Sequence, residues 1–147
     1  MIKYKVLILF FVIPLSVLSQ AKKDFFKNLN AKEKNVIVNK GTEYPNTGKY
    51  NKHFEKGTYH CKACDSPLYK SNSKFESNCG WPSFDDEIKN AITRHPDYKL
   101  GYKRVEICCA KCGGHLGHVF EGENFTEKNV RHCINSISLI FKPEKKN

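Results

Sequence analysis

Cys61-Lys62-Ala63-Cys64 and Cys109-Ala110-Lys111-Cys112 are two C-x-x-C motifs, and they decide the class of fold. Each motif is followed by residues that favour a tight turn, Asp65-Ser66 after the first and Gly113-Gly114 after the second. Because a C-x-x-C turn places two sulfurs on one side, the four cysteines together supply the ligands of a zinc ion. Four protein ligands leave no position for a catalytic water, so we expect this zinc to be structural.

The spacing of the two motifs is longer than in a compact zinc ribbon. Residues 65–108 lie between them, whereas roughly 15–20 residues separate the motifs of a compact ribbon. This spacing leaves room for an enzyme domain inserted between the two metal-binding turns. Any chemistry must then come from residues outside the motifs.

Residues 1–19 have the pattern of a secretory signal peptide. Two lysines precede residues 6–18, which are almost entirely apolar, as in a charged n-region followed by a short h-region. The small residues Ser19 and Ala21 predict cleavage after residue 19 or 21. We therefore expect an exported protein, periplasmic or otherwise extracytoplasmic. An uncleaved membrane anchor is the alternative, although a spanning helix needs about 20 apolar residues.

Export brings a second interpretation of the cysteines, because oxidising compartments favour disulfides over zinc sites. Seven cysteines leave one without a partner if three disulfides form. Outside the motifs lie Cys79, Cys108 and Cys133. Arg131 is two residues before Cys133, and an Arg near a thiol stabilises the thiolate, which is the attacking form. Cys133 is therefore the candidate nucleophile.

The composition is that of a single basic domain. The chain has 147 residues and a formal net charge of +10, and its 22 Lys are scattered while only three Arg occur. Nucleic-acid readers rely on Arg forks and basic stripes, so we expect no nucleic-acid partner. We expect a monomer with a solvated, lysine-rich surface.

The pattern of the chain is mostly β. Asn30 and Glu33 have the spacing of a capping box that opens a short helix, and Gly41 ends that region. The apolar spacing of residues 85–93 predicts a second short helix. Short β-type runs separated by turn residues predict strands at 58–61, 67–69, 104–108, 115–120, 130–133 and 136–141.

Two further motifs are Cys79-Gly80-Trp81-Pro82-Ser83-Phe84 and His115-Leu116-Gly117-His118-Val119-Phe120. Taken singly, the only tryptophan and the two histidines also fit the core. Positions i and i+3 on a strand face opposite sides, so His115 and His118 reach one site only if the strand bends. Gly117 permits such a bend.

Together with Arg131-His132-Cys133-Ile134-Asn135-Ser136 and the two C-x-x-C motifs, these segments resemble methionine sulfoxide reductase B. The resemblance covers about residues 31–142, which leaves 143–147 as a basic tail. It implies a small barrel-like domain of two antiparallel β-sheets with a structural zinc site and short N-terminal helices. It also implies reduction of the R epimer of methionine sulfoxide in peptides and oxidised proteins, with a thioredoxin-like reductant.

The same resemblance assigns roles to individual residues. Cys133 is the catalytic cysteine and Cys79 the resolving cysteine, and the substrate site is shaped by Trp81, His115, His118, Arg131 and Asn135. The chemistry needs these residue types, because sulfoxide sulfur is electrophilic only while its oxygen is protonated. Either histidine can supply that proton, and an indole can hold the S-methyl group. The resulting sulfenic acid condenses with a second thiol to a disulfide.

Three positions differ from the family pattern: Cys108, His132 and Asn46. Cys108 is interpreted as an inert buried thiol, with a resolving thiol or a substitute zinc ligand as alternatives. His132 and Asn46 replace aromatic residues and are expected to alter substrate preference. Two competing functions stay open: an exported zinc-ribbon binding module without catalysis, and a secreted protein stapled by disulfides.

Overall fold

The computed structural model describes residues 25–145. The signal segment predicted at 1–19 lies outside the described residues, as do the last two residues of the predicted tail. Within the described part of the chain, no helix is both long and apolar enough to cross a bilayer.

The described residues form helix α2, nine strands and two short 3-10 turns. In chain order these are α2 (Ala31–Ile37), β1 (Gly57–Cys61), β2 (Pro67–Lys70), η1 (Ser71–Ser73), β3 (Lys74–Phe75), β4 (Ser83–Phe84), β5 (Ile92–Asp97), β6 (Arg104–Cys109), β7 (His115–Glu121), β8 (Val130–Ile134), η2 (Ser136–Ser138) and β9 (Leu139–Pro143).

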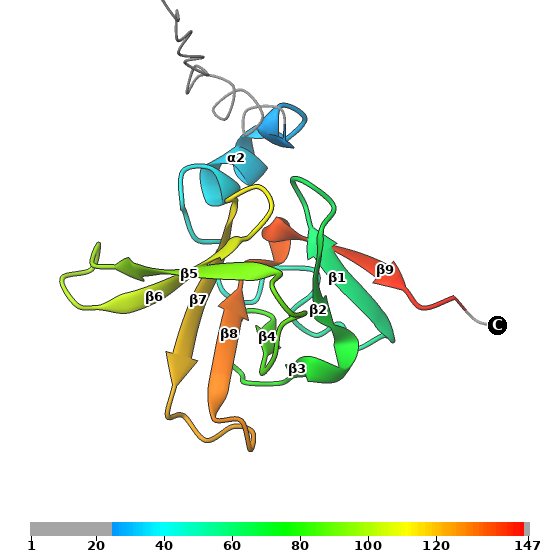
Figure 1. Cartoon of the computed structure of the whole chain (residues 1–147), viewed down its shortest axis with the longest axis vertical. Coiled ribbons are helices and arrows are strands. Elements are labelled where there is room, and N and C mark those ends of the chain that lie inside the picture. The colour runs from blue at the N-terminus through cyan, green and yellow to red at the C-terminus, as the bar shows by residue number, and fades with distance from the viewer. Residues whose placement is uncertain (1–24, 146–147) are drawn as a thin grey trace, which may run out of the picture.

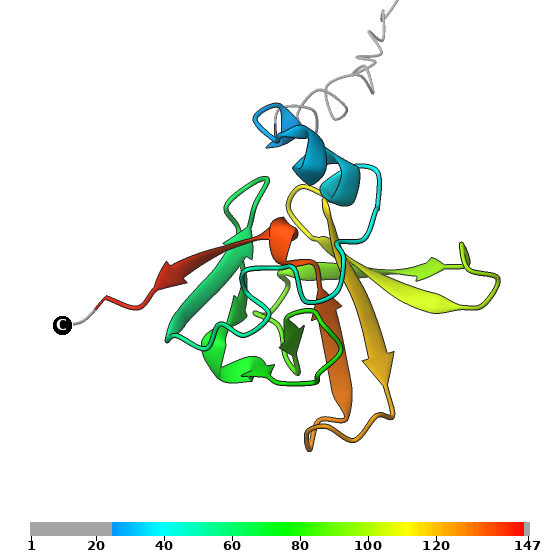
Figure 2. The ribbon, with the colours of Figure 1, turned by 180° about the vertical axis from the view of Figure 1, so that it is seen from behind.

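The strands form two antiparallel sheets. One has the order β2-β1-β9 and the other the order β3-β4-β8-β7-β6-β5. Figures 1 and 2 show that the sheets pack against each other without closing into one barrel. The core lies between them, where Tyr69 of β2 stacks on Phe84 of β4 at 4.4 Å. The prediction of a mostly β fold with two antiparallel sheets is confirmed.

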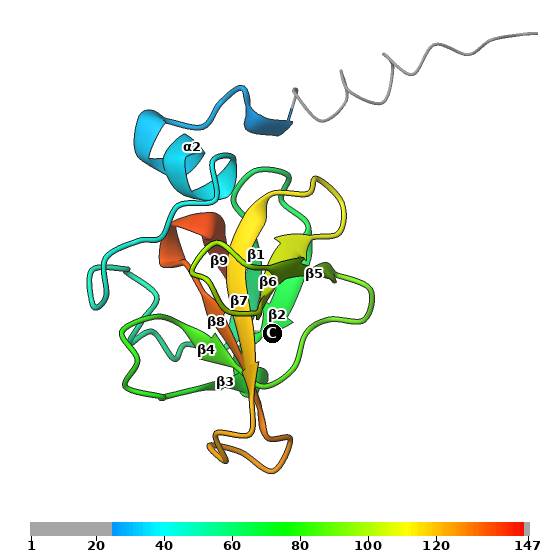
Figure 3. The same cartoon turned by 90° about the vertical axis from the view of Figure 1, so that its left-hand side faces the viewer.

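Helix α2 begins as the sequence predicts. The Asn30 side chain accepts a hydrogen bond from the backbone N–H of Glu33, and the Glu33 carboxylate accepts one from the backbone N–H of Asn30. This reciprocal capping satisfies two N–H groups that the first turn leaves without helical partners. Val36 and Ile37 are buried, and Figure 3 shows the helix covering one end of the sheets. The region ends at Gly41, whose N–H donates to the carbonyl of Asn35.

Five of the six predicted strands correspond closely to β1, β2, β6, β7 and β8. The sixth, predicted at 136–141, begins only at Leu139 because residues 136–138 form η2. Strand β5 was not predicted, since its residues are mostly polar and include Pro96. Proline is tolerated there because β5 is the edge strand of its sheet.

The helix predicted at 85–93 is wrong. Ile88 donates its backbone N–H to the carbonyl of Leu68, which ties this segment to β2. Asn90 then adopts a left-handed conformation with φ of 61°, and β5 starts at Ile92. The apolar residues that have helical spacing therefore lie in a loop that is hydrogen-bonded to β2 and at the start of β5.

The loop that follows α2 carries three aromatic residues, Tyr44, Tyr50 and Phe54. Of these, Tyr50 packs on the core, and its hydroxyl accepts a hydrogen bond from the backbone N–H of Phe141. Tyr44 and Phe54 are exposed. One aromatic residue is therefore enough to fix this loop against β9.

Candidate active site and metal centre

The four cysteines of the C-x-x-C motifs come together between the two sheets. Their Sγ atoms all lie within 4.8 Å of one another, and the Cys61 to Cys112 and Cys64 to Cys109 distances are both 3.6 Å. A tetrahedral zinc with Zn–S bonds of about 2.3 Å separates its sulfurs by about 3.8 Å, so the arrangement fits such an ion. All seven cysteines are free thiols, with no disulfide among the described residues.

The turns around this cluster are the tight turns that the sequence predicts. Asp65 donates its backbone N–H to the carbonyl of Cys61, and Gly113 donates in the same way to Cys109. Asp65 and Gly113 both have positive φ, 59° and 73°. The two turns follow β1 and β6, one strand from each sheet, and lie side by side next to α2 (Figure 1). A metal ion held here would link the sheets.

A small cavity of about 120 Å³ opens over β7 and β8. Its lining comes from both strands, from the start of β6, from the residue after β8, from the loop before β4 and from the loop after α2. The lining residues are Thr42, Trp81, Arg104, Gly117, His118, Phe120, Cys133 and Asn135. His118 lies directly opposite Cys133 in the pairing of β7 with β8. The structure thus places four of the sequence-predicted site residues on one cavity.

Cys79 lies at the edge of this site, with its Sγ 3.8 Å from the Sγ of Cys133. The hydrogen bond from Cys133 lowers the pKa of Cys79 to about 4, and the Ser77 and Ser83 hydroxyls act in the same direction. Ser77 donates to the sulfur at 2.9 Å. Cys79 is therefore the preferred position for a negative charge in the reduced pair.

The pKa of Cys133 is raised, first by its hydrogen bond to Cys79 and then by burial. Arg131 opposes both effects, because it lies on the same face of β8 and favours the thiolate. The Arg131 guanidinium is itself fixed by two hydrogen bonds to Glu123, at 2.7 and 2.8 Å, and it packs 4.6 Å from the centre of the Phe120 ring. The predicted Arg influence on Cys133 is present, while Cys79 acts more strongly.

Trp81 and Asn135 hold the loop after α2 over the cavity. The indole Nε1–H of Trp81 donates to the carbonyl of Glu43 at 2.9 Å, and the backbone N–H of Glu43 donates to the Asn135 Oδ1 at the same distance. Asn135 also donates its amide to the carbonyl of Leu116 at 3.1 Å. These bonds fix the indole and the amide as walls of the cavity.

The predicted bend in the histidine motif takes the form of a β-bulge. Ile107 and Cys108 are adjacent on β6, but their pairing partners on β7, Gly117 and His115, are two positions apart. Leu116 is the extra residue, and the bulge turns both histidines to one face of the sheet. Their ring centres lie 5.5 Å apart.

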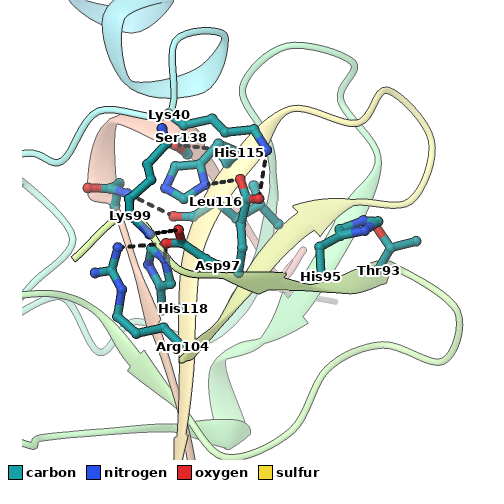
Figure 4. A network of polar contacts seen from close by, with 12 residues as sticks. Lys40, Thr93, His95, Asp97, Lys99, Arg104, His115, Leu116, His118 and Ser138 are labelled. Carbon is teal, nitrogen blue, oxygen red and sulfur yellow. Dashed lines mark hydrogen bonds and ion pairs between the residues drawn. The ribbon is translucent and has the colours of Figure 1, made fainter. Parts of the chain in front are cut away.

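The two histidines nevertheless have different surroundings. His118 lines the Cys133 cavity, and its Nε2 lies 2.8 Å from the Asp97 carboxylate. Figure 4 shows His118 and Arg104 converging on Asp97, which also accepts the backbone N–H of Lys99. That backbone hydrogen bond, together with His118 and Arg104, keeps the pKa of Asp97 well below its usual value. His118 is thus oriented by a carboxylate.

His115 lies behind this pair and is 2% exposed. Burial lowers its pKa, although the Glu106 carboxylate 2.8 Å from its Nδ1 acts in the opposite direction. Glu106 is in turn bonded to the Lys40 ammonium at 2.7 Å. His115 does not line the Cys133 cavity, so of the two candidate acids only His118 is in reach of it.

Two residues that depart from the family pattern do not line the cavity. Cys108 lies on β6, which β7 separates from the strand of Cys133, and its sulfur faces Glu106 and His115. It belongs neither to the four-cysteine cluster nor to the Cys79 and Cys133 pair. His132 faces the core, is 1% exposed and packs edge-on against Tyr69.

Sequence reasoning missed the residues that support the site, above all Asp97, Arg104 and Glu123. One signal could have found them: Arg is rare in this chain, so each of the three Arg has a specific use. All three pair with carboxylates, Arg94 with Glu87, Arg104 with Asp97 and Arg131 with Glu123.

Comparison with known proteins identifies the family of this chain. The SelR domain family matches residues 29–143, and the chain therefore belongs to this family, that of peptide methionine sulfoxide reductase B. It is 56% identical over 117 residues to "Peptide methionine sulfoxide reductase B2, chloroplastic" of Arabidopsis thaliana, a match covering 79% of this chain and 57% of that protein. It is 52% identical over 116 residues to "Peptide methionine sulfoxide reductase B5" of Oryza sativa subsp. japonica, covering 78% and 84%.

A yeast relative and a solved structure complete the comparison. "Peptide methionine sulfoxide reductase 2" of Saccharomyces cerevisiae is 54% identical over 115 residues, covering 74% of this chain and 68% of that protein. The chain thus spans little more than half of the Arabidopsis relative and larger shares of the other two. The Mis18 "Yippee-like" domain has a TM-score of 0.51 at 14% identity, covering 63% of this chain and 100% of that one, which shows a shared fold alone.

Proposed function

We propose that this protein reduces the R epimer of methionine sulfoxide in peptides and proteins to methionine. The observation that carries the proposal is the thiol pair of Cys79 and Cys133, 3.8 Å apart at a cavity that also presents Trp81 and His118. The names of the relatives support the same activity. A zinc-ribbon binding module would have no use for these two thiols.

In the proposed first step the Cys133 sulfur attacks the sulfoxide. Cys133 gives its proton to the Cys79 thiolate, 3.8 Å away, and the resulting Cys133 thiolate is favoured by Arg131. As this thiolate attacks, His118, oriented by Asp97, donates a proton to the sulfoxide oxygen. The S–O bond of the sulfoxide breaks and a new S–O bond to the Cys133 sulfur forms. Methionine leaves reduced by two electrons, and Cys133, oxidised by two, carries the oxygen and its proton as a sulfenic acid. Trp81 lines the same cavity as Cys133, and its indole can contact the S-methyl group of the bound sulfoxide.

In the proposed second step Cys79 resolves this intermediate. The Cys79 sulfur attacks Cys133, water leaves with the sulfenic oxygen, and a Cys79 to Cys133 disulfide forms. An external dithiol then reduces the disulfide and is itself oxidised to a disulfide. The lowered pKa of Cys79 supports this role, because the attacking form is the thiolate.

Turnover of the two sulfoxide epimers with a dithiol tests the proposal. We expect reduction of the R epimer only, no activity in Cys133→Ser, and release of one methionine equivalent without turnover in Cys79→Ser with a thioredoxin-like reductant. Substantial activity of Cys133→Ser would overturn the assignment of the nucleophile. Steady turnover of Cys79→Ser would remove Cys79 from the resolving role.

We further propose that the four-cysteine cluster holds a structural zinc. When bound, zinc would join the two sheets through Cys61 and Cys64 on one side and Cys109 and Cys112 on the other, and it would contribute directly to folding stability. Metal analysis of the purified protein should find one zinc, and Cys112→Ser should lose it and unfold at a lower temperature. Folded, active protein without zinc would contradict this proposal.

For location, the N-terminal sequence pattern supports export, with regeneration by an exported or membrane-linked thioredoxin-like protein. Fractionation of cells that express the full chain tests export, since an intact N-terminus in the cytosol would refute it. Trapping with a reductant that lacks its second cysteine tests the partner. A mixed disulfide is expected through Cys79 or Cys133, and capture through neither would reject this route.

A further inference from the structure

Most of the exposed large apolar side chains lie in loops that adjoin the Cys133 cavity. Seven such residues occur in the described part of the chain, and Val38 and Phe54 are two of them. The other five lie in three loops that lead into the lining of the Cys133 cavity. We call these five the apolar rim: Tyr44, Tyr98, Leu100, Tyr102 and Phe125.

The first loop brings Tyr44 to the cavity. Tyr44 is two residues after Thr42, which lines the cavity, and directly after Glu43, whose carbonyl accepts the indole N–H of Trp81. The Tyr44 side chain is 83% exposed although its backbone is fixed next to the site. It has no packing role that would explain an aromatic side chain at this position.

The other two loops are the tips of hairpins, which Figure 1 shows projecting from the six-stranded sheet. The β5–β6 tip carries Tyr98, Leu100 and Tyr102, each about 60% exposed, between Asp97, which orients His118, and Arg104, which lines the cavity. The β7–β8 tip carries Phe125. Its ring lies 5.9 Å from the Arg131 guanidinium, on the strand of Cys133.

The size of the cavity determines which part of a substrate enters it and which part lies over the apolar rim. At about 120 Å³ it has room for one side chain, whereas pockets that enclose whole small molecules measure roughly 300–1,000 Å³. When the side chain of a methionine sulfoxide residue enters, its backbone and neighbouring residues must therefore lie outside, over the loops of the rim. Exposed apolar clusters beside a pocket mark interaction surfaces.

We propose that the apolar rim binds the residues that flank methionine sulfoxide in a polypeptide, and that it favours flanking apolar side chains. This inference rests on the proposed function and adds a preference for sequence context.

The test compares three substrates in single turnover without a reductant. These are N-acetyl-methionine-R-sulfoxide amide, a peptide with Leu and Phe on either side of the sulfoxide, and the same peptide with Gly and Ser. For Tyr98→Ser/Tyr102→Ser we expect the rate at low concentration to fall about tenfold for the apolar peptide. The blocked amino acid should change less than about twofold. Phe54→Ser, an exposed aromatic away from the cavity, is the matched control and should change none of the three rates.

Each other result has a definite meaning. Equal losses with all three substrates, or no loss with the apolar peptide, would overturn the rim as a docking surface. A loss seen only in steady state with a thioredoxin-like reductant would also overturn it, because the rim would then serve the reductant. If the wild-type chain reduces none of the three substrates, the proposed function fails. Fluorescence anisotropy of the labelled apolar sulfoxide peptide then decides docking, since a rim that binds apolar segments must bind it more weakly in Tyr98→Ser/Tyr102→Ser.

Discussion

Gly117 lies so close to the backbone of Cys133 that a Cβ atom on Gly117 would be 1.9 Å from the Cys133 carbonyl oxygen. No flexible side-chain end is involved, because the obstructing atom belongs to the backbone of β8. The absence of a side chain at Gly117 therefore lets β7 and β8 pair at the point where His118 and Cys133 face each other. The same glycine follows the Leu116 bulge that aligns the two histidines.

Gly117→Ala should therefore damage both stability and activity. Relief of the clash requires β7 to move away from β8, so we expect a loss of several kcal/mol in the free energy of unfolding, at the high end for single substitutions. The measurement is chemical denaturation together with sulfoxide reduction. Gly122→Ala is the control, since a Cβ there meets nothing within 4 Å and only its φ of 84° is strained. Similar losses in both variants would mean that contact with Cys133 is not the cause.

Asp97→Asn should slow sulfoxide reduction without unfolding the protein. The carboxylate contacts His118 Nε2 and Arg104 at the same time, so its loss removes the charged partner that orients the imidazole. We expect the rate of reduction to fall at least about tenfold, but by no more than the roughly 10²–10⁴ that general acid catalysis contributes in total. We also expect the pH profile of the rate to change. Glu87→Gln, which removes the carboxylate of the Arg94 pair, is the matched control. An unchanged pH profile in Asp97→Asn would argue against a positioning role.

Cys79→Ser should lower the pKa of Cys133. The largest cause that raises this pKa is the hydrogen bond to Cys79, and without the Cys79 charge the remaining influence of Arg131 favours the thiolate. Alkylation of Cys133 by iodoacetamide, followed by mass spectrometry across a pH series, should shift to lower pH in the variant. Cys108→Ser serves as the control because Cys108 lies two strands away. A shift to higher pH would show that Cys79 does not suppress ionisation of Cys133.

His132→Phe should make the protein less sensitive to acid. Burial lowers the pKa of His132 to about 4, and its Nε2 accepts a hydrogen bond from Arg94 only while it is unprotonated. As the pH falls from about 6.5 to 4, the unfolded chain takes up a proton that the folded chain excludes. Stability is therefore lost over this window, by about 3 kcal/mol for a shift of this size.

Phenylalanine cannot take up that proton, and it can keep the edge-on packing against Tyr69. The measurement is the free energy of unfolding by urea at pH 7, 6, 5 and 4 for both proteins. The difference in stability between variant and wild type should move in favour of the variant as the pH falls. Parallel curves would contradict the buried, neutral state of His132.

Much of this fold could be predicted because its signals are local. The capping box of Asn30 and Glu33, the turns after the two C-x-x-C motifs and most of the long strands each depend on residues a few positions apart. The bend at Gly117 could also be predicted, since a histidine pair at i, i+3 can share a face of a strand only across an irregularity.

What could not be predicted depends on pairing between distant segments. Asp97 reaches His118 only because β5 and β7 both pair with β6, and the polar sequence of β5 gives no strand signal. The orientation of His132 follows from its place on β8, where alternate residues face the core and the cavity. The pattern at 85–93 misled because Ile88 is tied to β2, a contact that no local spacing reveals.

The arginine and lysine side chains of this protein have different electrostatic roles. Arg104, which lines the cavity, and Arg131, two residues before Cys133, have side chains only 18% and 8% exposed. The four lysines that pair with carboxylates among the described residues are 36–50% exposed. Exposed pairs contribute little to stability. The overall charge of the protein and the charges that govern its chemistry therefore belong to different side chains. Acylation of most surface lysines would move the isoelectric point far below its present value of about 9.3 while leaving the guanidinium groups at the cavity untouched.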